Sequence, residues 1–219
     1  ILILGELIMI DFSFFFKIIL WVLPLLFAIT VHETAHGWVA SKCGDPTAKL
    51  LGRLTLNPLK HIDPIGTIIV PTILFLLGGF VFGWAKPVPI TWQNLKNPRR
   101  DMALVAAAGP MANLAMAFFW VGAAKVAIGL NNAAFIYMAQ IGVSINLVLM
   151  LLNLIPIPPL DGSRVVASFL SPAMAYQFNK LEIYGFFILV FLLASGLLAR
   201  ILGPLLQGLL SIFFRFFGL

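Results

Sequence analysis

Charged side chains are scarce in this sequence. Asp, Glu, Lys and Arg make up 10% of its 219 residues, whereas hydrophobic residues make up 61%. Ordinary soluble domains contain about 25% charged residues. The mean hydropathy is +1.05, and a globule of this size has too little interior to bury so many Phe, Leu and Ile side chains. The composition excludes a water-soluble globule and indicates an integral membrane protein in contact with the lipid bilayer.

Cysteine and acidic residues are also few. The single cysteine, Cys43, excludes an intrachain disulfide framework and any zinc cluster built from several thiolates. Asp and Glu number 8 against 14 Lys and Arg, which gives a net charge of +6. These basic residues interrupt apolar runs and form no nucleic-acid-binding module. We interpret them as determinants of topology and anchors to lipid headgroups, and we expect no nucleic-acid partner.

Long apolar runs are what the sequence contains in abundance. We expect residues 1–8, which precede Met9, to be a non-native or misassigned leader, and residues 9–219 to form a single membrane-embedded domain. Lipid offers no hydrogen-bond partner to the backbone, so the runs must be helical. The fold prediction is an all-α polytopic membrane protein with about five to six transmembrane helices. The apolar runs cover 12–40, 65–83, 103–129, 134–156, 183–199 and 203–219.

One short segment departs from the helical pattern. Residues 86–90 read KPVPI, and their two prolines bias the preceding residues toward extended conformations. We therefore expect a short β element there, paired with a neighbouring segment.

The pattern HETAH at 32–36 lies inside the first apolar run. On a helix, His32 and His36 project from the same face, so both imidazoles can bind one metal ion. Glu33 lies next to that face, where it can act as the general base of a metal-dependent hydrolase. The competing interpretation is a structural pair of histidines hydrogen-bonded to neighbouring helices. We favour the metal site, because ionisable groups within a bilayer are costly and are by default functional candidates.

Catalytic zinc normally takes three protein ligands, so a third has to come from elsewhere in the chain. Cys43 follows His36 by about two helical turns, but a small hydrophobic side chain is the simpler interpretation of it. Asp161, in NLIPIPPLDG at 153–162, is a distant candidate, with a plain helix N-cap as its other interpretation. Three more candidates lie in a basic loop, where we expect them to be solvated: Asp45, His61 and Asp63.

HETAH, NLIPIPPLDG and the AAGPMAN of residues 107–113 together resemble the site-2 protease family of intramembrane zinc metalloproteases. The resemblance covers nearly the whole chain after Met9. It implies that Zn²⁺ is the cofactor, that Glu33 activates the water and that Asn153 lies in the active site, binding the substrate or stabilising the oxyanion. Many members carry a PDZ or CBS domain, and this chain is similar to a compact form with neither. The implied zinc ligands are His32, His36 and Asp161.

Other interpretations of two of these motifs are structural. Asn153 could form a helix-to-helix hydrogen bond at the break before Pro156. Within AAGPMAN, we expect Gly109 and Pro110 to permit close helix packing and Asn113 to hydrogen-bond nearby.

The resemblance implies hydrolysis of peptide bonds within or near transmembrane segments of a membrane-protein substrate. A helical peptide bond is hidden by its own hydrogen bonds, so the substrate must unwind, and residues 86–90 offer an extended edge for pairing with it. Two other functions stay open at this stage: a metal-ion or solute transporter that uses the buried His/Glu/Asp cluster, and an inactive zinc-binding membrane scaffold. The sequence does not define the oligomeric state.

The topology gives a further prediction. His36 and Asp161 both lie toward the C-terminal ends of their runs, so they reach one depth only if an even number of crossings separates them. The runs at 103–129 and 134–156 supply two crossings, so 65–83 should be re-entrant. The basic loops on both sides of 65–83 place the site toward the cytoplasmic side. The compact form suits a prokaryotic plasma membrane.

Overall fold

The computed structural model describes residues 14–78 and 83–217, so the expectation for residues 1–8 falls outside it. The described residues form helices and contain no β-strand. The longer helices are α2 (Phe14–Lys42), α4 (Val70–Gly78), α5 (Pro98–Gly129), α6 (Ala133–Asn153), α7 (Asp161–Phe169), α8 (Pro172–Asn179), α9 (Glu182–Ala194) and α10 (Leu197–Phe217). The short elements are α3 (Thr47–Leu50), η1 (Pro58–Lys60), the π-helical η2 (Pro64–Ile69) and η3 (Trp92–Asn94).

Four of the described helices are long and apolar enough to cross a bilayer, and α8 and α9 form a fifth crossing if they are one span bent by 55°. The predicted all-α membrane fold is confirmed, but the predicted five to six spans become four or five. The run at 183–199 breaks at Gly196, whose φ is 70°, which leaves α9 with 13 residues where a span needs about 20. The four long spans are Phe16–Lys42, Pro98–Gly129, Ala133–Asn153 and Leu197–Arg215.

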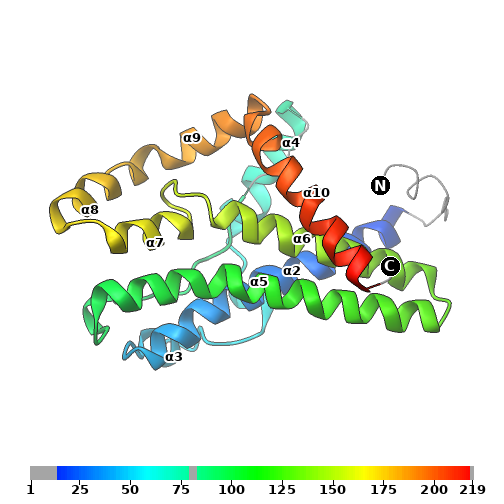
Figure 1. Ribbon diagram of the computed structural model, residues 1–219, viewed down its shortest axis with the longest axis horizontal. Helices are drawn as coiled ribbons and strands as arrows, with labels where there is room; N and C mark the ends of the chain where they lie inside the picture. Colours follow the sequence, from blue (N-terminus) through cyan, green and yellow to red (C-terminus); the bar gives the residue numbers. More distant parts are fainter. Residues whose placement is uncertain (1–13, 79–82, 218–219) are drawn as a thin grey trace.

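Three helices, α2, α5 and α6, lie side by side and form the central bundle, against which other helices pack (Figure 1). Asn131, at a φ of 51°, follows α5, and the Asn132 side chain caps α6 by accepting the N–H of Phe135 at 3.0 Å. This tight turn makes α5 and α6 antiparallel. The Lys96 N–H donates to the Cys43 carbonyl at 3.0 Å, which joins the end of α2 to the start of α5. Helices α2 and α6 therefore run in the same direction, as the topology argument requires.

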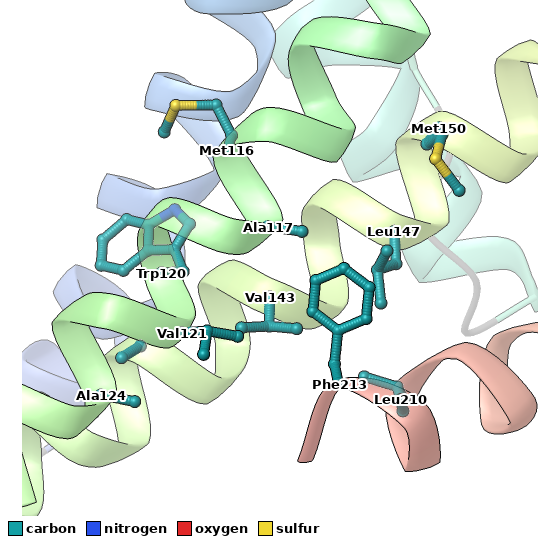
Figure 2. Packing of buried hydrophobic residues seen from close by; sticks show 11 residues of the cluster. Met116, Ala117, Trp120, Val121, Ala124, Val143, Leu147, Met150, Leu210 and Phe213 are labelled. Atoms are coloured by element: carbon teal, nitrogen blue, oxygen red, sulfur yellow. The ribbon is translucent and has the colours of Figure 1, made fainter. Parts of the chain in front are cut away.

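The apolar core lies between α5, α6 and α10 (Figure 2). Alanines and valines on the facing sides of α5 and α6 let the two backbones approach closely, which favours van der Waals contact between membrane helices. Gly142 lies directly against the Trp120 ring, because a Cβ there would come within 2.3 Å of it. The core residues are Met116, Ala117, Trp120, Val121, Ala124, Ala139, Val143, Leu147, Met150, Leu210 and Phe213.

The segment predicted to be re-entrant leaves the bundle and returns to its own starting point. It begins as η2 and continues as α4, and together these form a short apolar helix, Pro64–Leu77, below the length of a span. The Trp84 N–H then donates to the Gly66 carbonyl at 3.0 Å, and the Thr67 hydroxyl donates to the Trp84 carbonyl at 2.9 Å. This return is the geometry that a re-entrant segment needs, and its depth in the bilayer stays a prediction.

The predicted β element at 86–90 is wrong. The segment is extended, but its N–H groups bond to single groups rather than to a neighbouring strand: Lys86 donates to the His61 carbonyl at 2.9 Å, and Val88 donates to the Glu33 carboxylate at 2.9 Å. The two prolines that favour extended backbone also lack N–H groups, so they remove the donors that a strand ladder needs.

Candidate metal centre

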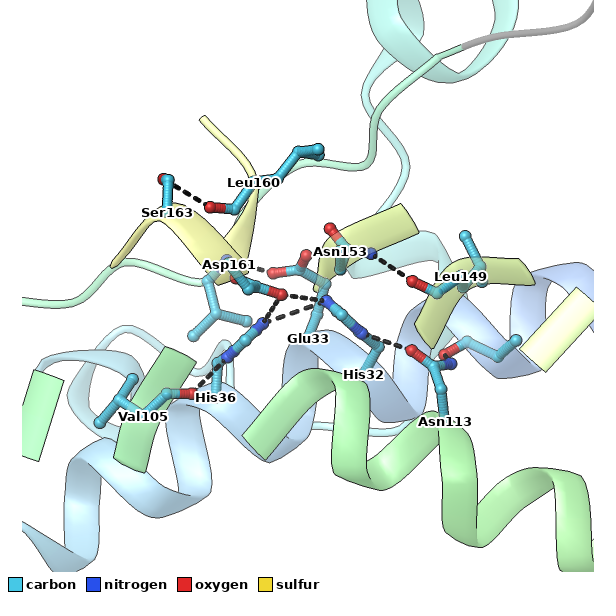
Figure 3. Close-up of polar contacts among 12 residues, drawn as sticks. His32, Glu33, His36, Val105, Asn113, Leu149, Asn153, Leu160, Asp161 and Ser163 are labelled. Atoms are coloured by element: carbon cyan, nitrogen blue, oxygen red, sulfur yellow. Dashed lines mark hydrogen bonds and ion pairs between the residues drawn. The ribbon is translucent and has the colours of Figure 1, made fainter. Parts of the chain in front are cut away.

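His32, His36 and Asp161 meet at one point between α2 and α7 (Figure 3). The two Nε2 atoms lie 3.1 Å apart, and Asp161 Oδ2 lies 3.2 Å from that of His32 and 3.3 Å from that of His36. The imidazoles are one turn apart on α2, and the Pro-rich segment after α6 returns Asp161 to their level as the first residue of α7. Both histidines are 7% exposed. The fold therefore brings the three predicted ligands, His32, His36 and Asp161, to one place.

The N–H groups of both imidazoles point away from this meeting point. His36 Nδ1 donates to the Val105 carbonyl at 2.7 Å, and His32 Nδ1 donates to Asn113 Oδ1 at 2.6 Å. In neutral rings both Nε2 atoms then carry lone pairs. Asp161 Oδ2, which faces them, is buried and has no hydrogen-bond donor in the described part of the chain. Three acceptors that face one another without a proton repel, unless a cation lies between them.

The donor set fits zinc. Ligands at about 2.0–2.1 Å from a tetrahedral ion are separated by about 3.3–3.4 Å, and the three distances here are 3.1, 3.2 and 3.3 Å. Two imidazoles and one carboxylate also leave the fourth position that catalytic zinc sites keep open. Metal-binding imidazoles usually donate their other N–H to a carbonyl or carboxylate, as both do here. The alternative of Asp161 as a helix N-cap fails, because α7 has no side-chain capping bond.

Helix α5 supports the site with three residues spaced four positions apart, which therefore lie on one face of the helix. Val105 and Asn113 accept the two imidazole N–H groups. Between them lies Gly109, where a Cβ would come within 2.4 Å of His36 Nε2 and 2.6 Å of His32 Nε2. Sequence reasoning expected helix packing from Gly109 and a nearby hydrogen bond from Asn113. The structure shows that both residues contact the imidazoles themselves.

The two remaining predicted site residues do not join the three-residue cluster directly. Glu33 Oε2 accepts the Val88 N–H at 2.9 Å, so the segment at 86–90 is bound beside the site. Asn153, the last residue of α6, donates its side-chain N–H to the Leu149 carbonyl of the same helix at 3.0 Å. This bond differs from the helix-to-helix bond considered above.

The other candidate ligands lie outside the cluster, and two of them are not solvated as predicted. His61 is 2% exposed, and its ring bonds to the Thr55 carbonyl at 2.9 Å. Asp45 is 0% exposed, and it accepts hydrogen bonds from the Thr91 N–H and the Asn94 side chain in the segment before α5. Asp63 caps η2 by accepting two backbone N–H groups. Cys43 is a partly buried free thiol.

Sequence reasoning missed one buried polar residue near the site, Asn146. It is 0% exposed and accepts a hydrogen bond from the Asn113 side chain at 3.0 Å. A signal was available, because Asn146 precedes Asn153 by two helical turns in a run with few other polar residues. A recurrent amide on one helical face indicates a shared polar environment.

Comparisons with known proteins agree with this site. The profile of "Peptidase family M50" matches residues 20–130 and 123–195. The chain is 40% identical over 194 residues to "Putative zinc metalloprotease YwhC" of Bacillus subtilis (strain 168), which covers 85% of each chain. It is 31% identical over 182 residues to "Putative zinc metalloprotease Rip2" of Mycolicibacterium smegmatis, covering 80% of this chain and 66% of that protein. No solved structure matches the chain.

A His-His-carboxylate cluster formed at a long apolar helix defines the class of membrane-embedded metalloenzymes. Within that class, the chain belongs to peptidase family M50, the site-2 proteases, and it is an integral membrane zinc metalloprotease whose cofactor is Zn²⁺. The family resemblance and the cofactor predicted from the motifs are confirmed.

Proposed function

We propose that the protein hydrolyses peptide bonds within or near transmembrane segments of membrane-protein substrates. The observation that carries this proposal is the convergence of His32, His36 and Asp161. Both histidines belong to a helix long enough to cross the bilayer. A hydrolytic centre held there acts on peptide bonds that other proteases cannot reach, because lipid covers them.

In this proposal, His32, His36 and Asp161 hold the zinc ion. Zinc bound there would polarise a scissile carbonyl and lower the pKa of water from its bulk value toward about 7. The residues supply orientation: the Val105 and Asn113 acceptors fix both rings with their Nε2 atoms toward the metal.

Glu33 is the proposed general base. Its Oε2 is held by the Val88 N–H at 2.9 Å, which leaves Oε1 to take the proton of the attacking water. As the C–N bond of the substrate breaks, Glu33 returns this proton to the leaving nitrogen.

Asn153 is the proposed substrate-binding or oxyanion-stabilising residue. One of the two N–H bonds of its amide is used within α6, and the other can donate to a substrate carbonyl. Its position at the end of α6, close in sequence to Asp161, supports this role.

Residues 86–90 are the proposed binding edge for the unwound substrate. In the described part of the chain, no hydrogen bond engages the Val88 carbonyl or the Ile90 N–H. The bond from Val88 to Glu33 means that a peptide paired with this segment passes next to the general base. Replacing Pro87 and Pro89 with Ala should raise KM at least several-fold, since the edge loses its extended bias. Pro172→Ala, at the exposed start of α8, is the control. Unchanged cleavage and binding would reject the edge.

The basic loops around the re-entrant segment support a cytoplasmic position for the site, in a prokaryotic plasma membrane. The loops meet in the structure, through the bond from the Lys86 N–H to His61 and that from the Lys96 N–H to Cys43. They therefore lie on one side of the bundle.

Glu33→Gln tests the activity. Gln keeps the acceptor for the Val88 N–H but cannot take a proton, so we expect kcat to fall about 10²- to 10⁴-fold. Cleavage of a transmembrane peptide in detergent and in liposomes measures activity, and elemental analysis measures zinc, which should be retained. Glu182→Gln at the start of α9 is the matched control and should cleave normally. A Glu33→Gln protein that cleaves like the parent, or a parent that carries ions across liposomes instead of cleaving, contradicts the proposal.

A further inference from the structure

A chain of hydrogen bonds connects the backbone of α6 to His32 through two side chains. The Asn146 side-chain N–H donates to the Gly142 carbonyl at 2.8 Å. Asn146 Oδ1 accepts the Asn113 side-chain N–H at 3.0 Å, and Asn113 Oδ1 accepts the N–H of His32 Nδ1 at 2.6 Å. Asn113 and Asn146 are both 0% exposed.

The backbone carbonyl at one end fixes the direction of every bond in this chain. A carbonyl only accepts, so the NH₂ of Asn146 must face Gly142 and its oxygen must face Asn113. The NH₂ of Asn113 must then face Asn146, which leaves its oxygen toward His32. A second carbonyl, that of Ala28, lies 3.4 Å from the same Asn113 nitrogen and requires the same orientation.

We infer that Asn146 is a positioning residue, which acts through Asn113 to set the tautomer and ring orientation of His32. This inference rests on the proposed metal centre. With the Asn113 oxygen toward it, Nδ1 carries the proton and Nε2 keeps its lone pair toward Asp161. With the Asn113 amide reversed, NH₂ would face Nδ1, the proton would move to Nε2, and His32 could no longer bind a metal.

The two imidazoles differ in how they are held. His36 donates directly to a backbone carbonyl, that of Val105, which cannot rotate. His32 donates to a side-chain amide, which can turn over unless something holds it. Asn146 supplies that restraint from a neighbouring helix through the shorter bond, at 3.0 Å, and the Ala28 carbonyl adds to it at 3.4 Å. Both imidazoles therefore have a fixed acceptor.

Asn146→Leu and Asn146→Asp test the inference by separating shape from hydrogen bonding. Leu is close in size but offers Asn113 no acceptor. A carboxyl buried among apolar helices is neutral, and its C=O and O–H reproduce the acceptor and the donor of Asn. Ser144→Ala is the matched control, because Ser144 also bonds to a carbonyl four residues earlier in α6, at 2.9 Å, but does not contact Asn113.

The readout is metal affinity of the full chain in detergent, measured by competition with a chromophoric chelator, together with the visible spectrum of the Co²⁺-substituted protein. Asn146→Leu should lose about 10- to 100-fold in Zn²⁺ affinity and show an altered Co²⁺ spectrum. Asn146→Asp should stay within about threefold of the parent, and Ser144→Ala should match it. The double variant Asn113→Leu/Asn146→Leu should bind no more weakly than Asn113→Leu alone, since Asn146 acts only through Asn113.

Parental affinity in Asn146→Leu, failure of Asn146→Asp to rescue, or additive losses in the double variant would each overturn the inference. If Asn146→Leu does not fold, Asn146→Ala replaces it in the same comparisons. The proposed metal centre fails in a different way: the parent itself would bind no Zn²⁺, or would bind it equally well after His32→Ala.

Discussion

At the scale of residues, the geometry of the site requires that residue 109 is glycine, which has no side chain. Gly109 lies against both imidazoles, and a Cβ there would fall 2.4 Å from His36 Nε2 and 2.6 Å from His32 Nε2. Rigid α5 cannot retreat without disturbing Val105 and Asn113, which hold the same rings.

We expect Gly109→Ala to abolish or strongly weaken zinc binding and cleavage, at a cost of about 1–3 kcal/mol in stability from overpacking. Elemental analysis and thermal unfolding in detergent measure the two effects. The control is Gly122→Ala in the same helix, where a Cβ meets no other atom within 4 Å. Full zinc content in Gly109→Ala would show that the rings have room to move.

At the scale of elements, a buried carboxylate joins the end of α2 to the segment before α5. Asp45 accepts hydrogen bonds from the Thr91 N–H at 2.7 Å, from the Asn94 side chain at 3.0 Å and from Thr47. Burial raises the pKa of the Asp45 carboxyl, but these hydrogen bonds lower the pKa by more, so it lies below its usual range. The bonds hold α2 and the segment after residue 90 at a fixed distance.

Asp45→Asn should destabilise the protein by about 1–3 kcal/mol, because an amide oxygen cannot satisfy all of these donors. The folded-state pKa lies below the unfolded value of about 3.9. The stabilisation by Asp45 is therefore complete above that value and is lost as the pH falls through the folded pKa. Unfolding of the parent and the variant in detergent should differ by a constant amount above about pH 5 and converge in acid. A difference that does not change with pH would show that the charge of Asp45 contributes nothing.

At the scale of the whole molecule, α2 ends and α5 begins at one end of the bundle, whereas the turn between α5 and α6 lies at the other end (Figure 1). The loops before and after residues 64–84 are joined by the bond from the Lys86 N–H to the His61 carbonyl. The Trp84 N–H returns to the Gly66 carbonyl. We therefore predict that both loops lie on the same side of the membrane.

Single cysteines introduced at Lys60 and Lys96, in a Cys43→Ser background, should react with a membrane-impermeant thiol reagent from the same side. Leu130→Cys, in the exposed turn between α5 and α6, should react from the opposite side, because α5 crosses between them. Opposite labelling at Lys60 and Lys96 would mean that residues 65–83 cross the bilayer.

The local pattern of the sequence was enough to predict some features of this protein and not others. Apolar runs predicted the long helices, because lipid forces such segments to satisfy their own backbone. The predicted five to six spans overlap the observed four or five only at five, since composition does not register the break at Gly196. The spacing of His32 and His36 predicted one shared face, because helical geometry is local. The third proposed ligand, Asp161, came from the family motif and not from spacing.

Tertiary structure alone decided which distant groups meet. Asp45 and His61 stand among lysines in the sequence, yet both are buried. Asp45 bonds to Thr91 of a distant segment, and the His61 carbonyl accepts the Lys86 N–H from the same distant segment. The bonds from Gly142 through Asn146 and Asn113 to His32 depend on how closely α5 packs against α6. Sequence fixes the hydropathy and geometry of each helix, since these depend on near neighbours. Only packing fixes the acceptor that each buried donor reaches, since that depends on the positions of separate helices.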